Sequence, residues 1–251
     1  MTTPAPTLLL IHGFLDDATV WDGLVGSLAG EAGVVRYDLP GFGARSGAVA
    51  DACSATLESL AAEAGDGVAG IDGPVIVVGQ SLGTQVAELV AAQHAERVRG
   101  LVLLTPVPLG GTQLPDTVVA PFRALAGDRE AQRAGRAELS PHLSEAQLDR
   151  LVDAGAVVAR EVGSHYVDLW NNGLQNAPAT SEFGGPVLII RGGSDAFVTK
   201  QMVHAISWRF SGVVDAEVID DGGHWVHVEY PEEVASMIRE FSRAVVGARQ
   251  S

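Results

Sequence analysis

Cysteine is almost absent from this 251-residue sequence, in which Cys53 is the only one. No disulfide can form within the chain, which fits a reducing compartment. Basic residues are also few. The chain has 16 Lys and Arg and 31 Asp and Glu, which gives a formal net charge of −15. A chain this acidic repels phosphate backbones and anionic membrane surfaces, so we expect neither nucleic acid nor a membrane as a partner.

Long hydrophobic runs and metal-binding motifs are missing as well. The apolar run at residues 8–11 is too short for a signal peptide or a membrane span, and residues 1–6 carry no basic side chain. These features predict a cytoplasmic protein. Its oligomeric state is open between a monomer and a small homo-oligomer. Cys-x-x-Cys, His-Glu-x-x-His and phosphate-loop lysine patterns do not occur, so we expect no metal and no cofactor.

Hydrophobic residues make up 47 % of the chain, which is enough to bury the core of one domain. Short apolar runs alternate with helical patterns, and strands that are apolar throughout are typical of a parallel sheet covered on both faces. We therefore predict an α/β fold with a mostly parallel sheet of about six strands. The predicted strands are 7–11, 33–37, 75–78, 101–104, 187–190 and 216–219, and the helical patterns are 20–28, 55–64, 81–93 and the segment from 231 onward.

Residues 106–186 interrupt this alternation, because they contain helical patterns but no convincing strand. We predict that they form a helical lid inserted into a core of residues 1–105 and 187–251, since ligands bind at the carboxyl ends of parallel strands. A capping-box spacing at Ser144-Glu145-Ala146-Gln147 opens one lid helix. Burial against the sheet explains most apolar lid positions. The candidates for substrate contact in the lid are Phe122, Tyr166 and Trp170.

A Gly-Gln-Ser-Leu-Gly sequence at residues 79–83 joins a predicted strand to a predicted helix. A sharp turn between strand and helix strains the backbone of the central serine and needs small residues two positions before and after it. Such a turn lifts the hydroxyl clear of the sheet. Ser81 is therefore the candidate nucleophile.

A serine hydroxyl is a weak nucleophile at neutral pH and needs a base, which a carboxylate orients. Of the seven histidines, His224 follows a predicted strand and the glycine-containing turn 220–223. A loop in this position can overhang the sheet, so His224 is the candidate base. The nearby His227 is better explained as a packing or supporting residue.

The matching acid should follow a strand that lies between the serine and the histidine in chain order. Asp195 does so, because it comes after the predicted strand 187–190 and a Gly-Gly turn. The competing carboxylates are less suitable. Asp215 precedes a strand, whereas Asp220 and Asp221 are too close to the histidine along the chain.

Attack on a carbonyl group builds negative charge on its oxygen, which two backbone N–H groups can stabilise. The Leu82 N–H is one candidate, since the first N–H groups of a helix have no partner within it. The turn His12-Gly13-Phe14 follows the first predicted strand, and its glycine lets the backbone bend close to the serine. The Phe14 N–H is the second candidate donor.

Together these segments resemble the α/β-hydrolase fold superfamily. The resemblance implies a triad of Ser81, Asp195 and His224, with oxyanion donors at Phe14 and Leu82. Trp225, next to His224, is a further candidate for substrate contact. Many members have an antiparallel strand pair ahead of the first parallel strand, and we expect this pair to be absent here. The resemblance is carried by His12-Gly13-Phe14, Asp38-Leu39-Pro40-Gly41-Phe42-Gly43, the serine turn at 79–83, Gly193-Ser194-Asp195 and Gly223-His224-Trp225.

The fold alone does not determine the reaction. A serine at the turn, in place of an aspartate, disfavours epoxide hydrolase and dehalogenase chemistry. We expect hydrolysis of a carboxylic ester or lactone of a small to medium hydrophobic substrate, through an acyl-enzyme on Ser81. The alternatives are carbon–carbon bond hydrolysis or perhydrolysis with the same triad, the latter as in the similar cofactor-free haloperoxidases. A hydrolase-like receptor for a small molecule is the alternative outside catalysis.

Overall fold

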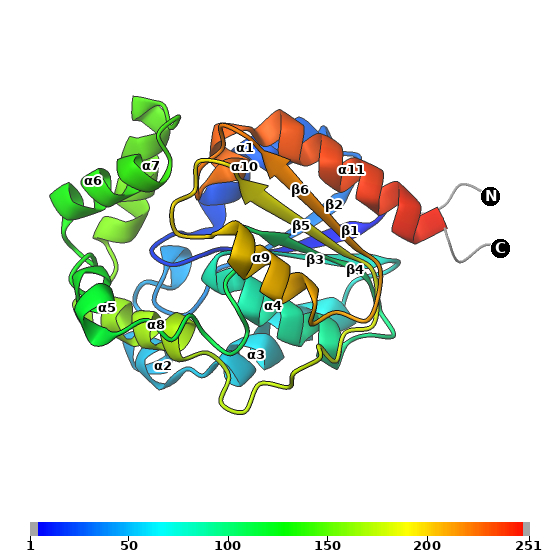
Figure 1. Ribbon diagram of the computed structural model, residues 1–251, viewed down its shortest axis with the longest axis horizontal. Coiled ribbons are helices and arrows are strands. Elements are labelled where there is room, and N and C mark those ends of the chain that lie inside the picture. Colours follow the sequence, from blue (N-terminus) through cyan, green and yellow to red (C-terminus); the bar gives the residue numbers. More distant parts are fainter. Residues whose placement is uncertain (1–4, 248–251) are drawn as a thin grey trace.

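The apolar runs form one sheet with the strand order β2-β1-β3-β4-β5-β6, in which every neighbouring pair is parallel. Figure 1 shows this sheet in the computed structural model, which describes residues 5–247. The predicted α/β class is confirmed, and the described residues contain no antiparallel strand pair ahead of β1. The strands are β1 (Thr7–Ile11), β2 (Gly33–Tyr37), β3 (Val75–Gln80), β4 (Val98–Leu104), β5 (Val187–Gly192) and β6 (Val214–Ile219).

Helices cover both faces of the sheet. Side chains of a strand alternate between its two faces, so each face carries its own hydrophobic cluster. Leu9 and Ile11 of β1 belong to a hydrophobic cluster with α3 and α4, whereas Leu8 and Leu10 belong to a second cluster with α1 and α11. Figure 1 shows these two helical layers above and below the strands. The covering elements are η1 (Ala18–Trp21), α1 (Asp22–Leu28), η2 (Gly43–Arg45), α2 (Val49–Ser54), α3 (Leu57–Ala69), α4 (Leu82–Gln93), α9 (Lys200–Ser207), α10 (Val226–Glu229) and α11 (Pro231–Gly247).

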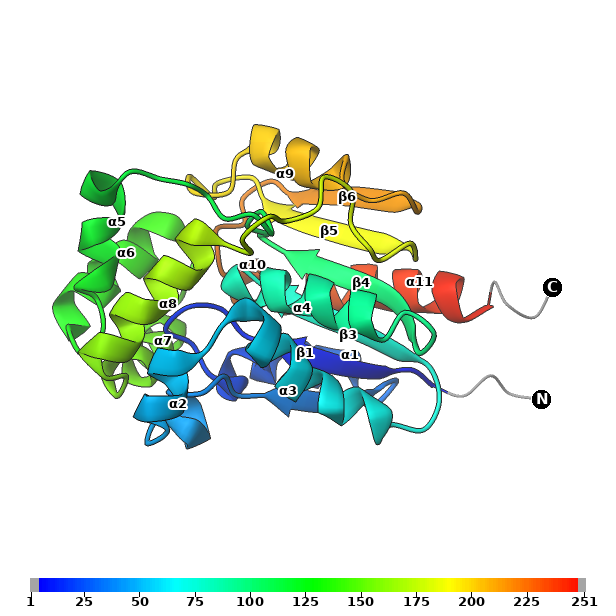
Figure 2. The same ribbon diagram turned by 90° about the horizontal axis from the view of Figure 1, so that it is seen from below.

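Between β4 and β5 the chain forms four helices and no strand. Figures 1 and 2 show these helices beyond the carboxyl ends of the strands. The capping box is present at the start of α7, where the Ser144 side chain accepts the Gln147 N–H and the Gln147 side chain accepts the Ser144 N–H. We call this segment the insertion helices: α5 (Asp116–Arg123), α6 (Arg129–Leu139), α7 (Glu145–Ala156) and α8 (Arg160–Asn172).

Among the helices of the described part of the chain, none combines the length and the apolar character needed to cross a bilayer.

Candidate active site

Ser81 occupies the turn between β3 and α4 with a φ of 51° and a ψ of −122°. This backbone conformation is rare for a residue with a side chain and stores strain. Two glycines permit the turn. A Cβ atom at Gly79 would overlap the carbonyl oxygen of Gly83, and one at Gly83 would overlap the carbonyl oxygens of Ile11 and His12. The Ser81 N–H donates to the last carbonyl of β4 at 3.0 Å, so the turn is bound to the neighbouring strand.

Asp195 follows β5 and His224 follows β6, so both lie at the carboxyl edge of the sheet. His224 Nδ1 donates to Asp195 Oδ2 at 2.8 Å. The other oxygen, Asp195 Oδ1, accepts the backbone N–H groups of Phe197 at 2.8 Å and Val198 at 3.0 Å. Burial by itself raises the pKa of Asp195, but the charge of His224 and the three hydrogen bonds outweigh it and lower this pKa below its usual value.

Ser81 and His224 line the same cavity, whose volume is about 620 Å³ when its open mouth is included. Because Asp195 occupies Nδ1 of the imidazole, Nε2 is the ring nitrogen that can accept the serine proton. Within residues 5–247 no hydrogen bond joins the Ser81 hydroxyl to this ring. Such a contact is often loose without substrate and shortens in the reacting complex.

The two expected oxyanion donors have N–H groups available. Within residues 5–247, neither the Phe14 N–H nor the Leu82 N–H donates to another protein group. Phe14 lines the cavity, and the close packing of Gly83 on the end of β1 brings the start of α4 next to the turn that contains Phe14. The arrangement can therefore present two N–H groups to one oxygen beside Ser81.

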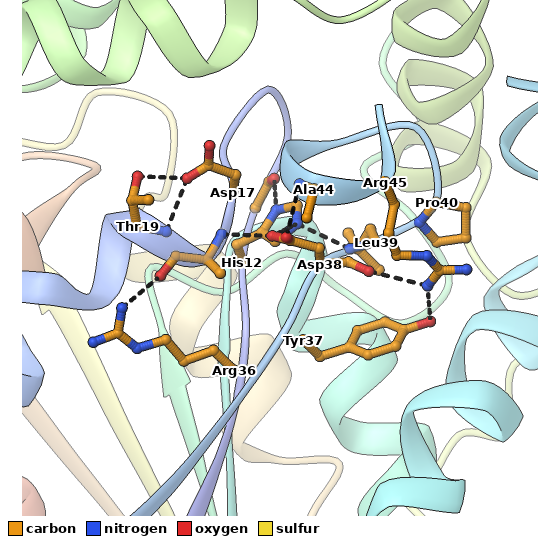
Figure 3. A network of polar contacts seen from close by, with 12 residues as sticks. His12, Asp17, Thr19, Arg36, Tyr37, Asp38, Leu39, Pro40, Ala44 and Arg45 are labelled. Carbon is orange, nitrogen blue, oxygen red and sulfur yellow. Dashed lines mark hydrogen bonds and ion pairs between the residues drawn. The ribbon is translucent and has the colours of Figure 1, made fainter. Parts of the chain in front are cut away.

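A polar network fixes the turn after β1, as Figure 3 shows. His12 Nε2 accepts the Leu39 N–H at 3.0 Å, so the proton of this ring is on Nδ1, which donates to Gly13 O at 2.8 Å. Asp38 Oδ1 lies 3.9 Å from His12 Nε2 and accepts the Ala18 N–H at 2.6 Å. The turn is thus held through its own carbonyl group and through the loop after β2.

Three of the four expected substrate contacts, Phe122, Trp170 and Trp225, line the cavity. The structure places Tyr166 elsewhere, because it is fully buried and its hydroxyl donates to Pro40 O at 3.0 Å. Helical spacing identifies the buried face of a helix, but it does not show which buried side chains reach a cavity.

Phe197 is a cavity residue that sequence reasoning missed. Its ring centroid lies 5.6 Å from that of Trp170, 6.0 Å from that of Phe122 and 5.8 Å from that of His224. The three aromatic rings therefore form one wall beside the imidazole. Its position in the loop that carries Asp195 is the signal that could have identified it.

Asp16 and Arg136 also line the cavity, and nothing in the sequence pattern singled them out. Arg136 Nη1 of α6 donates to Asp16 Oδ1 at 2.8 Å, across 120 positions of sequence. Trp225 Nε1 donates to Asp16 Oδ2 at 2.8 Å. These two contacts join three segments that are distant in the sequence, so no local motif could have predicted them.

The chain is similar over most of its length to proteins that are named as a lipase and an esterase. The chain is 31 % identical over 245 residues to lipase LipV of Mycobacterium tuberculosis (strain ATCC 25618 / H37Rv), covering 92 % of this chain and 91 % of that protein. It is 29 % identical over 245 residues to a pimeloyl-[acyl-carrier protein] methyl ester esterase of Neisseria meningitidis serogroup B (strain ATCC BAA-335 / MC58), with the same shares covered.

Among solved structures, a hydrolase from Oleispira antarctica matches with a TM-score of 0.81 at 16 % identity, covering 96 % of this chain and 92 % of that one. A bromoperoxidase from Bacillus anthracis matches with a TM-score of 0.79 at 20 % identity, covering 95 % and 92 %. At these identities the two structures show the shared fold alone. The model of the alpha/beta hydrolase family matches residues 8–237. The chain therefore belongs to the alpha/beta hydrolase family.

Proposed function

We propose that the protein is a serine hydrolase that cleaves carboxylic esters of small to medium hydrophobic compounds through an acyl-enzyme. The observation that carries the proposal is that Ser81 and His224 line the same cavity. Ser81 lies in a strained turn, and Asp195 orients the imidazole of His224. A serine, a histidine and a buried carboxylate in this order are the parts that acyl transfer requires.

The proposed reaction has two halves. Ser81 Oγ bonds to the carbonyl carbon of the ester while its proton passes to His224 Nε2, and the N–H groups of Phe14 and Leu82 bind the resulting oxyanion. The tetrahedral species then expels the alcohol, which takes the proton from the imidazolium. Water attacks the acyl group with His224 as its base, and the acid departs as the serine recovers its proton. Asp195 stays ionised and stabilises the imidazolium.

The composition of the cavity wall supports the proposal that the substrate is hydrophobic. Aromatic and aliphatic side chains make up most of it, and the charged pair Asp16 and Arg136 is neutralised internally. A neutral apolar group is bound in such a site without an unpaired charge being buried. The relatives named lipase and methyl ester esterase support ester hydrolysis over cleavage of a carbon–carbon bond.

A panel of p-nitrophenyl esters with acyl chains from acetyl to dodecanoyl tests the proposal. We expect the wild type to hydrolyse short and medium chains and Ser81→Ala to lose turnover by about 10⁴-fold or more. Ser54→Ala is the matched control, because Ser54 is exposed at the end of α2. Equal turnover by the wild type and Ser81→Ala would refute the acyl-enzyme mechanism.

Two further readouts separate the remaining alternatives. A fluorophosphonate followed by peptide mapping should modify Ser81, and the label should be absent from Ser81→Ala. Mass spectrometry of the products distinguishes the reactions, since an ester gives an acid and an alcohol, a lactone gives one hydroxy acid, and a diketone gives two carbonyl fragments. Tight ligand retention with a single slow turnover would indicate a receptor.

A further inference from the structure

A buried ion pair beside the reaction centre has no part in the mechanism above. Arg136 Nη1 and Asp16 Oδ1 are 2.8 Å apart, and their side chains are only 4 % and 1 % exposed. Burial of two charges is expensive, and a well-packed apolar pair would often be at least as stable. Its position in the wall of the catalytic cavity therefore points to a role beyond stability.

The guanidinium group binds the segment that carries an expected oxyanion donor. Arg136 Nη2 donates to Leu15 O at 2.6 Å. Leu15 has a φ of 59°, which is a costly conformation for a residue other than glycine. It directly follows Phe14. Because Arg136 binds the Leu15 carbonyl and the Asp16 carboxylate at once, it holds two consecutive residues of the loop after β1 in this conformation.

The same group contacts the neighbour of the catalytic histidine. Arg136 Cζ lies 4.7 Å from the ring centroid of Trp225, which is a cation–π contact. The Trp225 indole also donates to the Asp16 carboxylate. Its ring centroid lies 5.1 Å from that of His224, with the two ring planes at 79°. The guanidinium of Arg136 therefore links the loop after β1 to Trp225, which packs on the imidazole of His224.

The carboxyl end of α6 binds the histidine loop through its backbone as well. The His224 N–H donates to Leu139 O at 2.8 Å, and the Trp225 N–H donates to Ser140 Oγ at 2.8 Å. Helix α6 is thus bonded to the loop after β1 and to the loop after β6, and both loops contribute residues to the cavity wall.

We propose that Arg136 is a positioning residue, which keeps the Phe14 N–H and the His224 imidazole aligned across the cavity. The inference rests on the proposed function, because it gives Arg136 a part in that reaction. A lysine at this position keeps the charge beside Asp16. It offers a single ammonium group, which cannot reproduce the planar contacts with Leu15, Asp16 and the indole face at the same time.

The test compares Arg136→Lys with Arg133→Lys. Arg133 lies one turn earlier on α6 and forms exposed ion pairs with Glu145 and Asp149. For the best p-nitrophenyl ester we expect Arg136→Lys to lower kcat by at least about tenfold with KM nearly unchanged, because oxyanion donors act in the transition state. A trifluoromethyl ketone, which forms a tetrahedral adduct on the serine, should bind more weakly by the same factor. Arg133→Lys should match the wild type in all three.

Wild-type kcat and ketone affinity in Arg136→Lys would overturn the positioning role. An increase in KM alone would do so too, since it would mean that Arg136 only shapes the cavity. Amide hydrogen exchange over residues 12–17 is a readout that does not depend on turnover. We expect faster exchange there in Arg136→Lys than in Arg133→Lys, and equal exchange would contradict the proposal.

A second variant covers the case in which Arg136→Lys does not fold. Trp225→Phe removes the indole N–H and keeps an aromatic face below the guanidinium. We expect it to lower kcat and ketone affinity together, and unchanged values would overturn the link. Failure of the proposed function can be told apart from the results of both variants. In that case the wild type itself would hydrolyse no ester, and the fluorophosphonate would not label Ser81.

Discussion

Asp195 is held as a carboxylate by the groups that surround it. Burial raises its pKa, but the nearby His224 charge and the hydrogen bonds it accepts have the larger combined effect, so the pKa falls below its ordinary value. The stabilisation that this gives is present above the unfolded-state pKa and is lost as the pH falls through the lower folded-state pKa. At neutral pH the carboxylate is therefore available to orient the imidazole.

Asp195→Asn should nearly abolish turnover while the fold is retained. The amide has the volume of the carboxylate but no charge to stabilise the imidazolium, and it can present an N–H to Nδ1, which reverses the tautomer. We expect kcat to fall by about 10⁴-fold, the loss typical of this change in a serine–histidine–aspartate triad. Steady-state hydrolysis of a p-nitrophenyl ester measures it. Asp153→Asn, which removes an exposed partner of Arg129, should have no effect. A fall in kcat of less than tenfold in Asp195→Asn would show that Asp195 has no essential part in the reaction.

A single sequence predicts those candidate site residues that stand in a recognisable local context. Ser81, Asp195 and His224 each stand directly after a strand or its turn, so a single sequence indicates them. Asp16 and Arg136 could not be found in this way, because their pairing exists only after the insertion helices pack over the loop after β1.

The junction of β3 and α4 depends on two backbones that approach each other too closely for a side chain. Gly83 lies in the first turn of α4, against the carbonyl groups at the end of β1. An alanine there must displace α4 or the loop that carries Phe14. Both shifts move an expected oxyanion donor, so stability and turnover should suffer together.

Gly83→Ala should lower the free energy of unfolding by about 1–3 kcal/mol, as overpacking does, and reduce kcat strongly. Gly67→Ala is the matched control, because Gly67 also lies in a helix, α3, and a Cβ there would meet nothing within 4 Å. That change should raise stability by about 0.4–1 kcal/mol through the unfolded state and leave kcat unchanged. Urea unfolding and ester hydrolysis measure the two effects. Wild-type stability and turnover in Gly83→Ala would show that this close approach is not required.

The sequence predicted the strands better than their ends. β1 and β2 match their predicted ranges, because turn residues bound both apolar runs. β3 and β5 continue beyond the apolar runs through Gly79-Gln80 and Arg191-Gly192, since hydrogen bonding to neighbouring strands extends to residues with low strand propensity. Helical patterns predict the insertion helices as a class, and their place after a strand predicts that they lie at the carboxyl edge of the sheet. Individual contacts such as that of Arg136 with Asp16 depend on long-range packing, which the sequence pattern does not show.

Stability of the whole protein towards acid should depend on a histidine that takes no part in the proposed reaction. His227 is fully buried against Trp21, with ring centroids 4.6 Å apart, and within residues 5–247 neither of its ring nitrogens has a hydrogen-bond partner. Burial lowers its pKa to about 3, and the opposing charge of Asp16 does not offset this. The folded protein therefore keeps this ring neutral where an unfolded chain would protonate it.

The sign of the pH effect follows from linkage. The unfolded histidine binds a proton below about pH 6.5 and the folded one does not until far lower, so stability is complete above that pH and declines as the pH falls. Between pH 7 and pH 5 the loss due to one such group is about 2 kcal/mol. His227→Phe removes the titration and retains a ring that can pack on Trp21. Urea unfolding at the two pH values should show a loss smaller by about this amount in His227→Phe than in the wild type. His204→Gln, at an exposed position, should keep the wild-type loss, and an equal loss in His227→Phe would mean that another group is responsible for the acid sensitivity.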